Sequence, residues 1–254
     1  MSRPTYLSGD VHLGAVSRQR EDSFLRWLEH AGVRAEHVIL NGDLFDFWFE
    51  YGSVIPRGHT RVLGALAALV DGGVPVTLMG GNHDWWGGSY LEEEVGVTFL
   101  REPTVVSLAG HRTFLAHGDG LGRGDLGYRL LRLMLRSGPT RWAFRWLHPD
   151  VGARLARAVS ETERRGTTTP GEKDRARVLE GWGVAKLRSD PTLDLVILGH
   201  THIPMMTEVG VGRWYVNAGD WVTHHSYLVL EEGADPRLLE WEVNDARVED
   251  RPAS

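Results

Sequence analysis

The chain has 254 residues, of which 42% are hydrophobic and 24% are charged, and its formal net charge is −6. This length and balance are typical of one soluble α/β domain with a sizeable core. The absence of cysteine excludes disulfides, iron–sulfur clusters, thiolate zinc sites and cysteine nucleophiles. The negative charge argues against general nucleic-acid binding.

The sequence contains no segment that predicts membrane insertion. No run approaches about 18 consecutive apolar residues, and the first ten residues lack the apolar centre of a signal peptide. We therefore expect a cytoplasmic protein without a membrane-spanning helix. We also expect one domain over residues 1–254, because the length fits a single α/β unit.

Short apolar runs predict a series of buried strands along the chain. Five of them end beside a glycine and an Asp, Asn or His, namely the runs at 5–8, 38–40, 74–79, 114–116 and 193–198. In an open α/β sheet, ligands bind at the carboxyl ends of the strands. Five ends that share the same residue types therefore imply a common site.

Helical periodicity separates these strands. It predicts helices over 18–31, 59–70, 89–95 and 175–188, and a longer helical segment over 126–165. A hairpin is predicted around Ala109-Gly110, and short alternating strands are predicted over 204–243. This order favours two mixed β-sheets packed face to face, with helices outside and an inserted helical cap at about 122–170.

The five strand ends contain residues of the kinds that bind divalent metals. The blocks read D-x-H, G-D, G-N-H-D, H-G-D and G-H-T-H, and their candidate ligands are Asp10, His12, Asp43, Asn82, His117, His200 and His202. Oxygen and nitrogen ligands without cysteine suit manganese, iron or zinc better than calcium. A single Gly-Asp pair indicates only a turn, so the prediction rests on all five blocks together. Histidines outside these contexts, including His224 and His225, are interpreted as core or surface residues.

In this combination, the blocks resemble those of the calcineurin-like metallophosphoesterases over residues 10–202. The resemblance implies a four-layer α/β sandwich with two metal ions, in which Asp43 bridges both. One ion would be held by Asp10, His12, Asp43 and His202, and the other by Asp43, Asn82, His117 and His200. It also implies two catalytic residues: His83 would face the substrate phosphate, and Asp84 would orient that histidine.

In such a site, two cations activate water for in-line attack on phosphorus. We expect manganese as the metal, with iron and zinc as alternatives. A protonated His83 would stabilise the developing charge or protonate the leaving group.

The segment 126–159 has an unusual composition. It contains seven arginines and one acid, Asp150, interleaved with bulky apolar residues. Such a mixture suits a membrane interface or an anionic amphiphile, with arginines meeting lipid phosphates while Trp142, Phe144 and Trp146 enter the acyl boundary. The alternative is an ordinary helix pair with its apolar face inward and its arginines in water. Because the segment follows the H-G-D block, we expect it to overhang the metal site.

Two further stretches narrow the resemblance. The residues 42–48 and 117–121, followed by Asp125-x-x-Tyr128, resemble the UDP-2,3-diacylglucosamine pyrophosphatases of lipid A biosynthesis, over most of 5–222. The resemblance implies hydrolysis to UMP and 2,3-diacylglucosamine 1-phosphate, with the cap taking the acyl chains. The implied substrate contacts are Asn82, His83, Asp125, Tyr128, Arg157, Ser160, Arg164 and His200. Many members of that family have arginine where His83 stands, and Thr167 replaces a basic residue.

A lipid-linked sugar nucleotide is thus the expected substrate. The protein is expected on the inner face of the cytoplasmic membrane, bound peripherally to its anionic surface through the 126–159 cap. The main alternative is a soluble metallophosphoesterase that acts on a nucleotide or a phosphoprotein. A nuclease of the same superfamily is disfavoured by the negative net charge of the chain. A metal-binding scaffold that docks partners through residues 44–51 is disfavoured because the set of candidate metal ligands is complete.

Overall fold

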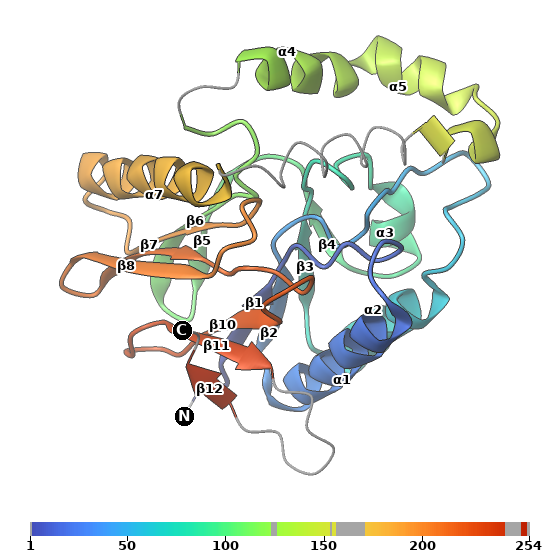
Figure 1. Cartoon of the computed structure of the whole chain (residues 1–254). Helices are drawn as coiled ribbons and strands as arrows, with labels where there is room; N and C mark the ends of the chain where they lie inside the picture. The colour runs from blue at the N-terminus through green and yellow to red at the C-terminus, as the bar shows by residue number, and fades with distance from the viewer. Residues whose placement is uncertain (1, 123–125, 153, 156–170, 242–249, 253–254) are drawn as a thin grey trace.

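Two mixed β-sheets lie face to face, and helices cover the outer face of each (Figure 1). The structure is a computed structural model, and it describes residues 2–122, 126–152, 154–155, 171–241 and 250–252. The layers run helix, sheet, sheet, helix, which confirms the predicted four-layer α/β sandwich.

The larger sheet has seven strands. Their order across the sheet is β12 (Asp250–Pro252), β11 (Arg237–Trp241), β10 (Ser226–Leu230), β1 (Thr5–Ser8), β2 (His37–Leu40), β3 (Val76–Met79) and β4 (Thr98–Leu100). Neighbours from β1 to β4 are parallel, and β10 joins β1 in the antiparallel sense. The carboxyl ends of β1, β2 and β3 therefore meet at one edge of the sheet.

The smaller sheet has five strands. Their order is β5 (Thr104–Leu108), β6 (His111–Leu115), β7 (Leu195–Leu198), β9 (Arg213–Asn217) and β8 (Met205–Gly210). β6, β7 and β9 are parallel neighbours, and β5 and β8 pair with them in the antiparallel sense. The predicted hairpin is confirmed, because β5 and β6 pair around Ala109-Gly110.

The central strands are apolar on both faces because each sheet is covered on both sides. Val38 and Leu40 of β2 pack into the core beneath the helices, whereas Ile39 between them points into the core that separates the sheets. The smaller sheet alternates in the same way, with Ile197 between the sheets and Val196 against the outer helix. Alternation at period two thus places neighbouring residues of one strand in different cores.

The outer helices are those predicted, with small shifts at their ends. α1 (Arg18–Arg34), α2 (Thr60–Asp71) and α3 (Ser89–Glu93) cover the larger sheet, and α7 (Glu172–Ser189) covers the smaller one (Figure 1). The hydroxyl of Ser17 caps α1 by accepting the backbone N–H of Arg20. Two strands were not predicted, β4 and β12, which are each only three residues long.

The predicted cap contains α4 (Leu126–Leu135) and α5 (Gly138–Arg145), which lie above the sandwich in Figure 1. The boundaries of the cap at about 122–170 stay a prediction, since 123–125 and 156–170 lie outside the described residues. The single-domain organisation over 1–254 also stays a prediction. None of the described helices combines the length and the apolar character of a membrane-spanning segment.

Candidate metal centre

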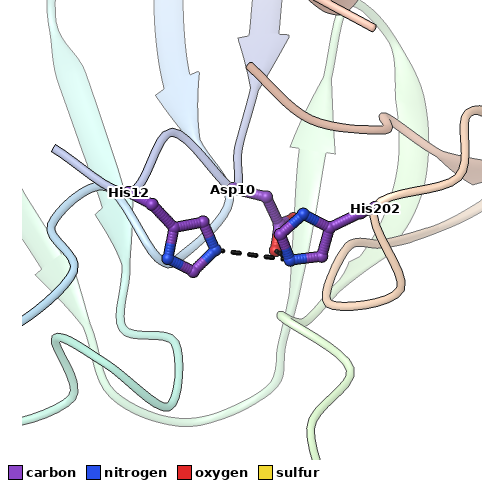
Figure 2. A group of neighbouring side chains, drawn as sticks. All are labelled: Asp10, His12 and His202. Carbon is purple, nitrogen blue, oxygen red and sulfur yellow. Dashed lines mark hydrogen bonds and ion pairs between the residues drawn. The ribbon is translucent and has the colours of Figure 1, made fainter. Parts of the chain in front are cut away.

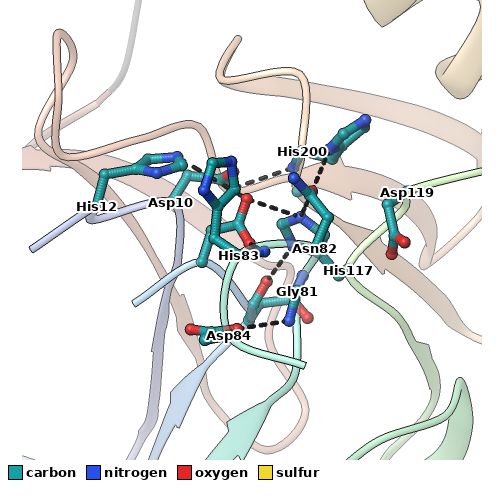
Figure 3. Close-up of polar contacts among 12 residues, drawn as sticks. Asp10, His12, Gly81, Asn82, His83, Asp84, His117, Asp119 and His200 are labelled. Carbon is teal, nitrogen blue, oxygen red and sulfur yellow. Dashed lines mark hydrogen bonds and ion pairs between the residues drawn. The ribbon is translucent and has the colours of Figure 1, made fainter. Parts of the chain in front are cut away.

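The loops that follow β1, β2, β3, β6 and β7 converge on one another, as the five sequence blocks predict (Figure 3). Backbone hydrogen bonds join them directly: Asp10 N donates to Gly42 O at 2.9 Å, and Gly199 N donates to His117 O at 2.7 Å. The side chains of these loops therefore meet on a rigid frame rather than on independent loops.

Within the described part of the chain, three overlapping groups of side chains have ligand atoms that lie within 4.8 Å of one another. They are Asp10, His12 and His202; His12, Asp43 and His83; and Asp43, His117 and His200. His12 and Asp43 each belong to two groups, so the three groups form one continuous cluster. Six of the seven predicted ligands are members, and the seventh, Asn82, is hydrogen-bonded to two of them.

The first group has the geometry of a coordination site (Figure 2). His12 Nε2 and His202 Nε2 lie 3.3 Å apart, and His202 Nε2 lies 3.5 Å from Asp10 Oδ1. That carboxylate oxygen is buried and has no hydrogen-bond partner. A buried oxygen without a partner is costly unless something else satisfies it. A divalent cation among these three residues would satisfy the oxygen and separate the two ring nitrogens.

The second group surrounds Asp43 and Asn82. His117 Nε2 lies 3.2 Å from Asp43 Oδ2, and it lies 3.2 Å from Asn82 Oδ1, which is also 3.0 Å from His200 Nδ1. The opposite nitrogen of His117, Nδ1, is 3.0 Å from the carbonyl of Asn41. A carbonyl can only accept, so Nδ1 donates and Nε2 is left to face the cluster.

The backbone at the ligand positions is unusual. Asp10, His12, Asp43, His200 and His202 all have φ between 50° and 68°. This left-handed region is uncommon for residues other than glycine, and such conformations concentrate at functional sites. The strand ends therefore turn sharply at the residues whose side chains enter the cluster.

Two glycines of the sequence blocks are required by close approach. A Cβ at Gly81 would overlap the Asp43 carboxylate, and a Cβ at Gly199 would lie 2.6 Å from Asp10 Oδ2. The glycines of G-N-H-D and G-H-T-H thus leave room for the carboxylates that would bind metal. Space, unpaired oxygen and donor chemistry together fit divalent metal ions.

The charges in the cluster are strongly coupled. Burial alone would raise the pKa of Asp43, but the imidazoles of His117 and His83 hold it well below its usual range. Burial would lower the pKa of His117, but Asp43 raises it well above the ordinary value. Burial and the charge of His117 lower the pKa of His200 to about 4, and burial raises the pKa of Asp10. A cluster of coupled carboxylates and imidazoles can therefore bind cations in place of protons.

Asp84 joins two of the loops that form the cluster. The Asp84 carboxylate accepts backbone N–H groups from Leu44 and Gly81, each at 2.7 Å, and so joins the loops that carry Asp43 and Asn82 (Figure 3). Burial and the neighbouring Asp43 raise the pKa of Asp84 to about 6. These contacts give Asp84 a structural role in joining the two loops, and the prediction that it also orients His83 stays a prediction.

The ring of His83 is held by Asp46. His83 Nδ1 lies 2.8 Å from the Asp46 carbonyl and 3.9 Å from its carboxylate Oδ1. The His83 backbone N–H also donates to Asp43 Oδ1 at 2.9 Å. Asp46 was missed from the sequence, although it stands only three residues after Asp43 in the G-D block.

A second missed residue is Asp220, whose Oδ2 lies 3.1 Å from His202 Nδ1. Its other carboxylate oxygen accepts from His224, which had been interpreted as a residue without a site context. The signal was present in the sequence, because Gly219-Asp220 follows β9 as Gly42-Asp43 follows β2.

The cap is attached next to this cluster. Arg132 Nε lies 3.1 Å and Arg136 Nη2 lies 2.8 Å from Asp119 Oδ2, two residues after His117. The guanidinium of Arg136 also lies 4.8 Å from the ring centre of Trp85. These two arginines therefore point inward, which corrects the expectation that they meet lipid phosphates or water.

An aromatic contact attaches the other cap helix. Phe144 of α5 is buried, with its ring centre 4.7 Å from Phe49 and 4.8 Å from Trp86. The prediction that Phe144 enters an acyl boundary is wrong, because the aromatic loop after β2 already covers it. Trp142 and Trp146 of the same helix are 67% and 75% exposed.

The predicted substrate contacts are only partly described. Asn82, His83 and His200 lie in or beside the cluster. Asp125, Arg157, Ser160 and Arg164 lie outside the described residues, as does the side chain of Tyr128. Their assignment stays a prediction.

Comparisons with known proteins place the chain in a family. The family model described as calcineurin-like phosphoesterase matches residues 4–204. A UDP-2,3-diacylglucosamine hydrolase of Porphyromonas gingivalis is 34% identical over 259 residues, covering 91% of this chain and 95% of the relative. Proteins of the same name from Pseudomonas aeruginosa and Aeromonas salmonicida are 33% and 30% identical, covering 77% and 90% of this chain and 80% and 90% of the relatives. Because the family match spans most of the chain, this protein belongs to the calcineurin-like phosphoesterases and is a metal-dependent phosphoester hydrolase.

Proposed function

We propose that the protein hydrolyses the pyrophosphate bond of UDP-2,3-diacylglucosamine and releases UMP and 2,3-diacylglucosamine 1-phosphate. This places it in lipid A biosynthesis. The substrate class is supported by the relatives of that name, which align with nearly the whole chain.

The observation that carries the proposal is the position of the cap beside the metal centre. Arg132 and Arg136 are bound to Asp119, so α4 lies over the loop that also carries His117. Several of its described apolar side chains are exposed, with Leu133 71% exposed and Leu130 70% exposed. A phosphoester at the cluster would thus lie beside the cap, whose exposed apolar side chains would be available to acyl chains or to a membrane surface.

We assign two divalent metal ions to the cluster, with manganese as the first choice. Asp10, His12 and His202 would hold one ion, and Asn82, His117 and His200 would hold the other, with Asp43 shared. The sharing is supported by the position of Asp43 in two of the ligand groups. When bound, such ions supply Lewis-acid activation of water and charge for the phosphate oxygens.

The chain itself would position and protonate the substrate. Asn82 and His200 would contact the phosphate from the cluster, and His83 would face the leaving oxygen. The Asp46 carbonyl holds His83 Nδ1–H, so the remaining ring nitrogen is the one available for proton transfer. The sugar and the acyl chains would be bound by Asp125, Tyr128, Arg157, Ser160 and Arg164 and by the cap.

The outward face of the cap would contact an anionic membrane surface. An ordinary amphipathic helix turns its apolar side inward, but here Leu130, Leu133 and Met134 face outward while Arg132 and Arg136 face Asp119. Trp142 and Trp146 extend this apolar surface along α5. Burial of a large apolar side chain contributes about 1.5–3 kcal/mol when complete, so a few of them suffice for reversible binding.

The test is UMP release from UDP-2,3-diacylglucosamine, compared with UDP-N-acetylglucosamine and a chromogenic phosphodiester. The acylated substrate is expected to be preferred, because only it can use the cap. Equal turnover of the chromogenic diester, with no response to acyl chains or detergent, would contradict the proposal. That result would favour a soluble phosphoesterase acting on a nucleotide or a phosphoprotein.

A further inference from the structure

His202 presents its two ring nitrogens to different surroundings. Nε2 faces the cluster, 3.5 Å from Asp10 Oδ1 and 3.3 Å from His12 Nε2. Nδ1 faces away from it and lies 3.1 Å from Asp220 Oδ2. A neutral imidazole carries one N–H, and a carboxylate can only accept. Both nitrogens face carboxylate oxygens, but Nδ1 makes the shorter contact, 3.1 Å against 3.5 Å, so the proton of neutral His202 belongs on Nδ1. Nε2 then carries the lone pair, and a cation between Nε2 and Asp10 would satisfy both groups.

Asp220 is itself held in place on several sides. Its Oδ1 accepts the backbone N–H of Thr223 at 3.0 Å, the backbone N–H of His224 at 2.8 Å and the Nδ1–H of His224 at 3.1 Å. The side chain is 2% exposed. Its orientation is thus set by the turn between β9 and β10 before any metal binds.

The same turn also fixes Asp10. The backbone N–H of Trp221, the residue after Asp220, donates to the Asp10 carbonyl at 3.2 Å. The short turn after β9 therefore contacts both Asp10 and His202 and helps to set the distance between them. Asp220 is not a member of any of the ligand groups found among the described residues.

We propose that Asp220 is a positioning residue that keeps His202 in the tautomer able to bind metal. It does so by accepting the Nδ1 proton and fixing the ring plane toward Asp10 and His12. Carboxylates that hold the far nitrogen of a metal-binding histidine typically change metal affinity about 10–100-fold. The inference rests on the ligand role of His202 in the proposed function.

The variant that isolates this role is Asp220→Asn. Its amide oxygen can still accept from Thr223 and His224, so the turn is retained. Its NH₂ group replaces the acceptor opposite His202 Nδ1, and a donor there favours the proton on Nε2. The ring would then present N–H instead of a lone pair to the metal.

The measurement is manganese stoichiometry and affinity by calorimetry, together with the urea unfolding midpoint of the metal-free protein. We expect Asp220→Asn to weaken binding of one ion about 10–100-fold while the second site and the unfolding midpoint stay unchanged. Histidine ¹⁵N NMR of the metal-free protein should show the protonated nitrogen of neutral His202 move from Nδ1 to Nε2. Asp190→Asn is the matched control, because Asp190 accepts in a similar turn with Thr192 and lies outside the cluster.

Unchanged manganese affinity in Asp220→Asn would overturn the inference. Weaker manganese binding together with a lower urea unfolding midpoint of the metal-free protein would also overturn the inference, because Asp220 would then be a structural residue only. A wild-type protein that binds manganese without releasing UMP would contradict the proposed substrate, while the metal measurement would still test Asp220. A wild-type protein that binds no divalent metal would overturn both.

Discussion

The metal centre and the cap are built on opposite principles. In the metal centre, polar side chains are buried and are placed by left-handed backbone at strand ends, as at Asp10 and Asp43. In the cap, apolar side chains such as Leu133 and Trp146 are exposed, while Arg136 is directed inward. The comparison teaches that chemistry and substrate selection are carried by separable parts of the molecule.

Among the described residues, contacts from both cap helices join the two regions. Asp119 is 5% exposed and binds both Arg132 and Arg136, so the loss of one arginine would leave part of a buried charge unpaired. Phe144 adds an aromatic anchor on the opposite side of the cap. Trp142 and Trp146 take no part in these contacts, so they can be altered without removing them.

The largest effect is expected from Asp43→Ala. Removal of the shared carboxylate should abolish hydrolysis of every substrate, because both proposed ion sites lose a ligand. Circular dichroism and the urea midpoint should show a folded protein, since Asp43 stands at a strand end rather than in an apolar core. Asp71→Ala, at the exposed end of α2, is the control and should remain active. Retained activity in Asp43→Ala would contradict the assignment of catalysis to this cluster.

His83→Ala should have the next largest effect. A proton donor typically contributes about 10²–10⁴-fold to the rate, so kcat should fall in that range while both metal ions remain bound. Steady-state kinetics with metal analysis of the same samples would measure this. His148→Ala, an exposed histidine of the cap, should leave kcat unchanged. Loss of metal from His83→Ala would instead make His83 a ligand, as its place beside His12 and Asp43 permits.

Metal affinity should depend on pH in a definite direction. Burial lowers the pKa of both His117 and His202, but nearby carboxylates raise it above the ordinary value, Asp43 for His117 and Asp10 for His202. These rings are therefore protonated as the pH falls, and the ions must displace the protons. Each displaced proton weakens binding about tenfold per pH unit below the pKa. Titrations of manganese at several pH values would show this, and a pH-independent affinity would contradict it.

The smallest effect is expected at the outward face of the cap. Changing Trp142 and Trp146 to serine should weaken co-sedimentation with anionic liposomes and raise the KM for the diacylated substrate severalfold. Turnover of a small soluble diester should not change. High salt should weaken liposome binding further, because it screens the exposed charges.

Phe144→Ala provides the contrast within the same helix. It should destabilise the attachment of the cap by about 3–5 kcal/mol, because Phe144 is buried, and limited proteolysis would detect this. If the variant with Trp142 and Trp146 changed to serine loses activity equally toward the diacylated substrate and the soluble diester, the cap is structural and the lipid assignment fails.

Much of the metal centre could be predicted from the sequence. Local signals sufficed for it, because a glycine and a ligand residue at the end of a short apolar strand specify both the turn and the side chain. The ligand candidates therefore converge as expected. The order of strands and helices favoured two sheets packed face to face, the family resemblance implied the four layers, and both are confirmed by strands such as β2 and β7 that are apolar on both faces.

The orientation of side chains around the centre could not be predicted. Composition does not say which side of α4 faces the protein, so the inward turn of Arg132 and Arg136 depended on Asp119, a residue of a distant loop. The roles of Asp46 and Asp84 depended on which backbone amides lie nearest in space. For Asp220, the Gly-Asp signal after β9 was visible in the sequence, but its contact with His202 depended on how the turn after β9 packs beside the loops after β1 and β7.

The most direct test of the account is the number and position of the metal ions. Crystals grown with manganese should give two anomalous peaks, one among Asp10, His12 and His202 and one among Asn82, His117 and His200, with Asp43 between them. A fully loaded protein with one peak, and with Asp43 away from it, would contradict the account.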